Sequence, residues 1–285
     1  MTQNNNLSVL PWYDSISQQN HRKDYAFGQV FPLVTPDRRL PPFQIVRSTR
    51  ENQISQVLLK TVDGKQFADI TVPMKETGLV IKRYESDGYD LFKYPGILPM
   101  AINTPEGQYY AEISDGVQRW YSEVFTIKRN IGNEYLTIEW WDDDTLYFNG
   151  GCIDYEHFKN KVYLCTQVGK PDYKFDEDGT NRDGYFFAEK QISKKIYKFS
   201  FLAPEYLIDA MRIIFMSDHV EIESHGITYD VDRFLIVPKW QEQGDLAAVE
   251  AEFETDTVIK KIVRGDILTL VGDYNKDFNN DFNNE

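Results

Sequence analysis

Hydrophobic and polar positions alternate with a period of two along residues 108–128, and Asp115-Gly116 interrupts the alternation. An Asp-Gly pair between two such runs is the strongest short-range signal of a β-hairpin closed by a two-residue type I′ turn. Counting outward from that turn pairs Glu112 with Arg119. Opposite charges on facing strands favour this register, so the sequence predicts a hairpin with this pairing.

Shorter alternating runs of the same kind fill residues 43–129. Asp63-Gly64, Asp87-Gly88 and Pro95-Gly96 separate several of them, and these pairs are typical of turns. Short strands at this spacing are characteristic of an immunoglobulin-like or fibronectin-like sandwich. We therefore expect a mainly β protein whose residues 43–129 form an N-terminal β-sandwich domain.

A second β-rich region is predicted for residues 134–272, after a polar stretch around Gly132 that marks a domain boundary. One helix interrupts its strands. Pro204 suits the first turn of a helix. Apolar residues then recur at helical spacing: Tyr206, Leu207, Ala210, Met211 and Ile214. This second domain is therefore expected to be of the α+β type, with one amphipathic helix.

The two ends of the chain carry aromatic residues on a polar backbone. Residues 1–42 are predicted to form an N-terminal arm, and residues 273–285 an acidic low-complexity tail with two Asp-Phe-Asn-Asn repeats. Neither segment can form a core of its own, so their aromatic side chains are expected to contact neighbouring copies. The alternative is a lid on their own domain. The expected contact residues are Trp12, Tyr13, Phe27, Phe31, Phe278 and Phe282.

Charge and hydropathy exclude several classes of partner. The 285 residues include 45 acidic and 31 basic ones, which gives a net charge of −14. Nucleic-acid binding needs a basic surface that displaces counterions, so no nucleic-acid partner is expected. No window reaches the roughly 18 apolar residues of a membrane span, and residues 1–6 lack the basic and apolar regions of a signal peptide. Cys152 and Cys165 are predicted to be buried free thiols, with a single disulfide as the alternative.

Two acidic segments contain side chains that could bind a metal ion. In residues 176–184, the sixth position of an EF-hand loop would be Asn181 instead of Gly, and the twelfth would be Phe187 instead of Glu. A solvated acidic loop is therefore predicted there. In residues 219–225, a strand would place His219, His225 and two Glu on one face. An ordinary polar strand face produces the same pattern, and we expect no metal.

Trp140 and Trp141 are followed directly by Asp142, a combination that could form an aromatic platform and a carboxylate for a sugar. A loop after a buried strand explains the same residues. The sequence has no G-x-S-x-G, H-E-x-x-H or G-x-x-x-x-G-K-[ST] motif. We therefore expect neither an enzyme nor a cofactor.

Several strings of the sequence stand out together: residues 10–14 with 19–22, 40–45, 109–125, 204–210 and 218–222. They resemble a family of structural proteins encoded in phages and prophages of Bacteroidetes-type bacteria. The match spans most of the chain, but its motifs are structural and none is a catalytic fingerprint. The resemblance implies a virion protein of the tail or baseplate, made in the host cytoplasm, and it transfers no functional residue.

These observations lead to one expected function and two alternatives. The expected function is a non-enzymatic ring or hub component that assembles with copies of itself and with other virion proteins. The first alternative is a carbohydrate- or receptor-binding β-sandwich protein that uses Trp140, Trp141 and Asp142. The second is a β-sandwich hydrolase whose acidic residues the sequence does not identify.

Overall fold

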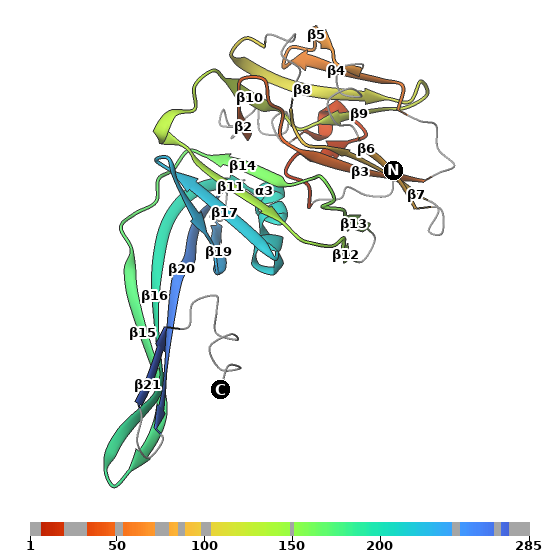
Figure 1. Ribbon diagram of the computed structural model, residues 1–285. Helices are drawn as coiled ribbons and strands as arrows, with labels where there is room; N and C mark the ends of the chain where they lie inside the picture. Colours follow the sequence, from red (N-terminus) through yellow and green to blue (C-terminus); the bar gives the residue numbers. More distant parts are fainter. Residues whose placement is uncertain are drawn as a thin grey trace.

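The computed structural model describes residues 7–19, 33–48, 54–71, 80–84, 89–97, 104–148, 151–240, 246–264 and 269–273. Strands dominate these residues, which confirms the expected mainly β class. They form a body of several sheets from which a long β-ribbon projects (Figure 1).

The largest sheet has eleven strands and follows the order β1-β9-β8-β10-β2-β14-β11-β17-β18, with β4 paired to β8 and β5 paired to β4. Its strands are β1 (Trp12–Tyr13), β2 (Leu33–Pro36), β4 (Gln56–Thr61), β5 (Gln66–Asp69), β8 (Gly107–Ser114), β9 (Arg119–Ser122), β10 (Phe125–Lys128), β11 (Leu136–Trp141), β14 (Asn160–Leu164), β17 (His219–Ser224) and β18 (Ile227–Asp230).

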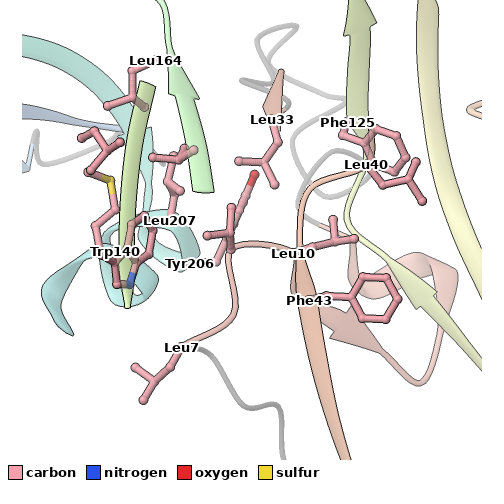
Figure 2. Close-up of a cluster of buried hydrophobic side chains, with 14 of the residues drawn as sticks. Leu7, Leu10, Leu33, Leu40, Phe43, Phe125, Trp140, Leu164, Tyr206 and Leu207 are labelled. Carbon is pink, nitrogen blue, oxygen red and sulfur yellow. The ribbon is translucent and has the colours of Figure 1, made fainter. Parts of the chain in front are cut away.

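The described part of residues 1–42 supplies two strands of this sheet and is not a separate arm. Strand β1 pairs with β9, and β2 pairs in parallel with β10 on one side and with β14 on the other. Because β10 precedes the boundary expected at residues 129–134 and β14 follows it, the sheet continues across that boundary. The buried hydrophobic cluster does the same and includes Leu10, Phe43, Trp140 and Leu207 (Figure 2).

Smaller elements cover the main sheet. A three-stranded sheet consists of β3 (Phe43–Ser48), β7 (Tyr89–Tyr94) and β6 (Val80–Tyr84), and a two-stranded sheet of β12 (Leu146–Phe148) and β13 (Gly151–Ile153). In the part of the chain that the structure describes, the helical elements are η1 (Ile16–Gln18), η3 (Gly132–Glu134), α3 (Glu205–Met211) and η4 (Arg212–Met216). The predicted helix is confirmed, because α3 begins directly after Pro204 and buries the apolar face read from the sequence.

The predicted β8–β9 hairpin exists, but its register is different. Glu112 lies opposite Tyr121 instead of Arg119, so the loop comprises the four residues Asp115–Gln118. A type I′ turn needs positive φ at both central residues. Of the Asp115-Gly116 pair, only Gly116 has one, at 91°. The Asp115 carboxylate accepts hydrogen bonds from two backbone amides of the loop and so favours the longer loop.

The ribbon consists of β15 (Asp172–Arg182), β16 (Tyr185–Pro204), β20 (Leu246–Arg264), β19 (Arg233–Trp240) and β21 (Thr269–Asp273), in the order β15-β16-β20-β19 with β21 also paired to β20. The solvated loop predicted at residues 176–184 is therefore wrong, because most of this segment is strand β15. It is closed by Asp183-Gly184, whose φ angles of 52° and 81° form the two-residue turn expected at Asp115-Gly116.

A β-bulge at Gly179 interrupts the pairing of β15 with β16. A Cβ atom at this position would lie 2.1 Å from the Phe187 carbonyl oxygen, so only glycine fits the observed backbone. The bulge lies close to the tip of the ribbon. A β-bulge increases the local twist of the strands that it joins.

Candidate functional site

The two tryptophans at the end of β11 have different surroundings, because side chains alternate across a strand. Trp140 has 0% exposure and belongs to the buried cluster. A sugar ring therefore cannot stack on it. Trp141 lies on the opposite face of the strand and is half-buried. Of the expected platform, only Trp141 and Asp142 remain near the surface.

Two side chains from neighbouring elements contact the Trp141 ring. His219 is its cross-strand neighbour on β17 and stacks on it, with ring centroids 5.1 Å apart and planes 15° apart. The ammonium group of Lys159, just before β14, lies 3.3 Å from the centre of the indole ring. This distance is within the range of a cation–π interaction. Trp141 is thus held in one orientation by both neighbours.

A cavity of about 450 Å³ lies beside Trp141. Buried Tyr155 and Phe158 contribute to its lining, and burial raises the pKa of the Tyr155 hydroxyl. The cavity is also lined by Arg39, Pro95, Glu139, His157, Lys159 and Lys161. Its volume falls within the range of small-molecule sites.

The charge of this cavity is opposite to that of the whole chain. Arg39, Lys159 and Lys161 bring three positive charges, and Glu139 is the one carboxylate among the lining residues. Glu139 is bonded to Lys161 and lies 3.9 Å from the Lys159 ammonium. A positive excess remains, so the cavity favours an anionic or acidic ligand. Sequence reasoning missed these cations, because they come from distant segments and form no local motif.

Asp142 is fixed by a reciprocal pair of hydrogen bonds with Asp218. The backbone amide of Asp218 donates to Asp142 Oδ1 at 2.8 Å, and the backbone amide of Asp143 donates to Asp218 Oδ2 at 3.2 Å. Desolvation raises the pKa of the Asp142 carboxyl, and the nearby Asp218 charge adds to this effect. Asp142 Oδ2 is buried without a hydrogen-bond partner among the described residues. Asp142 therefore joins the loop that follows β11 to the residues that precede β17.

The residues considered as metal ligands do not converge. The strand face predicted for residues 219–224 is correct, with Val220 and Ile222 buried on the other side. His225, however, lies beyond the strand in a turn with a φ of 53°, and His219 is bonded to Asp143 at 2.9 Å. Within the residues that the structure covers, no group of His, Cys, Asp and Glu side chains could hold a metal ion.

The expected contact residues of the N-terminal segment lie inside the molecule where they are described. Trp12 is 4% exposed and packs edge-on against Phe43, with centroids 4.9 Å apart. The Tyr13 hydroxyl donates to Glu123 at 3.0 Å. Both placements match the alternative of packing on their own chain and differ from the expected intermolecular contact. Four other expected contacts lie outside the described residues: Phe27, Phe31, Phe278 and Phe282.

Exposed aromatic side chains occur instead on the ribbon. Tyr173, Phe175, Tyr185 and Phe186 are between 50% and 72% exposed. The sequence signal for this strand is the alternation of Tyr173 and Phe175 with polar residues, directly before the acidic residues 176–184 that predict a solvated loop. Cys165 is exposed and free, so its predicted burial is wrong, and the side chain of Cys152 lies outside the described residues.

None of the helices in the described ranges is long and apolar enough to span a membrane. No family model, curated protein or solved structure matches the chain. The assignment of a function therefore depends on the arrangement of its own residues.

Proposed function

We propose that this chain is a non-enzymatic structural protein of a bacteriophage particle, acting by oligomeric assembly as a ring or hub component of the tail or baseplate. The observation that carries the proposal is the ribbon, whose strands β16 and β20 have 20 and 19 residues and extend beyond the body (Figure 1). Its proposed partners are copies of the same chain and other virion proteins.

The energetics of the ribbon support a role in assembly. Every side chain of β15 from Asp172 to Asp178 is exposed, on both faces of the strand. A narrow β-ribbon without a covering layer buries little apolar surface and is at best marginally stable in water. Large exposed aromatic residues on such a ribbon are characteristic of a surface that another protein covers. Projecting elements of this kind spread contacts across a symmetric assembly.

The test is to locate the protein in purified particles. Antibodies against the full chain should label tails or baseplates in immunogold electron microscopy, and the purified chain should form closed oligomers in negative-stain images. A matched antibody against a host cytoplasmic protein serves as the control. If particles purified to homogeneity contain no trace of the chain by mass spectrometry, the proposal is wrong.

A second candidate function is the binding of an acidic glycan or receptor, and the cavity beside Trp141 is the observation that favours it. A glycan array probed with the full chain should show uronic-acid or sialic-acid ligands. Binding should decrease at least tenfold in Trp141→Ala and remain unchanged in Trp240→Ala, because Trp240 is exposed on β19, away from the cavity. Equal binding by both variants would contradict this function.

A further inference from the structure

We propose that one face of the ribbon is a two-fold contact surface for a second copy of this chain. This ribbon face is the surface that carries Tyr173, Phe175, Glu177, Ser193, Val258 and Lys260. The inference rests on the proposed function, since it names the partner and the surface used in assembly.

The strand register places these residues on the same face. Phe175 lies opposite Ser193, and Ser193 lies opposite Val258, which defines one row across β15, β16 and β20. Two residues along each strand, the next row places Glu177 opposite Gln191 on β16. Gln191 in turn lies opposite Lys260. Residues two apart in a strand point to the same side, so both rows belong to the ribbon face.

The ribbon face continues the buried face of the body beyond the point where the body covers it. Nearer the body, Tyr197 of β16 stacks on Phe253 of β20 with ring centroids 5.1 Å apart. At Lys195 and Ser193, two and four residues farther toward the tip of the ribbon on β16, no other described element covers this face. There Tyr173 is 60% exposed, Phe175 is 72% exposed and Val258 is 44% exposed. An apolar row of this kind requires a cover, and nothing in the described residues provides one.

The pattern across the strands is self-complementary. The two-fold axis lies between the two ribbon faces and runs parallel to β16. Rotation about it places the β15 side of one ribbon over the β20 side of the other. Phe175 of one copy then faces Val258 of the second copy, and Glu177 faces Lys260. Ser193 lies on the axis and faces its own counterpart. In these two rows each apolar residue therefore meets an apolar residue, and each charge meets the opposite charge twice, as an isologous interface requires. In the row nearer the body, Tyr173 faces Thr255 of the second copy.

The remaining charges agree with this arrangement. No hydrogen bond or ion pair joins the Lys260 side chain to the side chains that the structure describes, whereas Glu177 accepts a hydrogen bond from the neutral Gln191 at 2.6 Å. Both charges can thus pair across the interface. Lys195 of β16 lies on the axis in the row nearer the body and faces its own counterpart, and its charge is already paired with Asp256 of its own copy at 2.7 Å. Balanced charge on this face favours a second copy over a polyanion as the partner.

Cross-linking tests the position of the axis. In a Cys165→Ser background, Ser193→Cys should give a disulfide-linked dimer under mild oxidation, because two thiols meet on the axis. Ile192→Cys is the matched control, since its side chain points to the opposite face of β16, and it should remain monomeric on a non-reducing gel. Equal cross-linking of both variants, or none by Ser193→Cys, overturns the inference.

Charge reversal tests the pairing. Glu177→Lys and Lys260→Glu should each raise the dimer dissociation constant at least tenfold in analytical ultracentrifugation. Mixing the two variants should restore the affinity, because both cross-interface contacts then join opposite charges. Circular dichroism checks that each variant is folded. Two single variants that dimerise as tightly as the unchanged chain overturn the inference.

The two proposals fail separately. If the chain is present in particles but neither cross-links through Ser193→Cys nor responds to charge reversal, the contact surface is wrong and the structural function stands. If the chain dimerises through the ribbon face but is absent from particles, the proposed function is wrong and the contact surface stands.

Discussion

The ammonium group of Lys93 lies 2.8 Å from Asp154 Oδ1, and the two side chains are 2% and 1% exposed. Lys93 belongs to β7 and Asp154 follows β13, so this ion pair joins the three-stranded sheet to the segment that leads into β14. The same ammonium donates to the Glu156 carbonyl at 2.6 Å. The Gln44 amide binds the backbone of Asp154 through both its oxygen and its nitrogen. Two regions that the sequence assigns to different domains are thus connected by a buried polar network.

We expect Lys93→Met to destabilise the protein by about 3–5 kcal/mol, because it leaves the Asp154 carboxylate buried without its cation. The double change Lys93→Met with Asp154→Leu should recover part of this loss, because no buried charge remains. Lys65→Met is the control: its ion pair with Asp63 is exposed, and such pairs contribute about 0–1 kcal/mol. Urea denaturation measures all three. Equal stability of Lys93→Met and Lys65→Met would contradict the role of the buried pair.

Removal of residues 1–42 should abolish cooperative unfolding, because this segment supplies β1, β2 and side chains of the buried cluster. The single change Trp12→Ala is expected to cost about 3–5 kcal/mol, the usual range for a buried aromatic residue. Trp240→Ala, at an exposed position, should stay within about 0.5 kcal/mol of the unchanged chain. A chain of residues 43–285 that melts as sharply as the full protein would show that the segment is dispensable.

Gly116→Val should destabilise the protein by about 1–3 kcal/mol, because a β-branched residue is strained at a φ of 91°. The cost comes from the backbone alone, since a Cβ atom at this position meets no other atom within 4 Å. Gly107→Ala is the matched control: its φ is not positive, and its Cβ would make an ordinary contact with Tyr109. Thermal unfolding compares the two, and an unchanged melting temperature for Gly116→Val would refute the strained loop.

The raised pKa of Asp142 predicts a pH dependence. The folded chain holds this proton more tightly than the unfolded chain, whose pKa is near 3.8. Stability should therefore fall as the pH rises from about this value through the folded-state pKa. Asp142→Asn should lose this slope and be at least as stable as the unchanged chain at pH 7, because Oδ1 still accepts from Asp218.

Asp144→Asn is the control for that measurement, because it removes the same charge at an exposed position. The melting temperatures of the unchanged chain and of both variants are compared between pH 3.5 and pH 7. The prediction fails if Asp142→Asn keeps the full pH slope of the unchanged chain, or if it is less stable than Asp144→Asn at neutral pH.

The sequence alone determined the features that depend on neighbouring residues. Helix α3 follows from Pro204 and the apolar positions after it, and the buried face of β17 follows from Val220 and Ile222. The mainly β class follows from the many short alternating runs. Each of these depends on the period of side-chain directions, which is a local property of the backbone.

Only the tertiary structure decided which strands pair and where side chains from distant segments meet. A shift of two residues at Asp115-Gly116 leaves every side chain on the same face, so the alternation cannot distinguish the two registers. The placement of β2 between β10 and β14, and the cations beside Trp141, depend on contacts between residues far apart in the chain. The polar strand β15 resembles a loop in composition and becomes a strand because β16 supplies its hydrogen-bond partners.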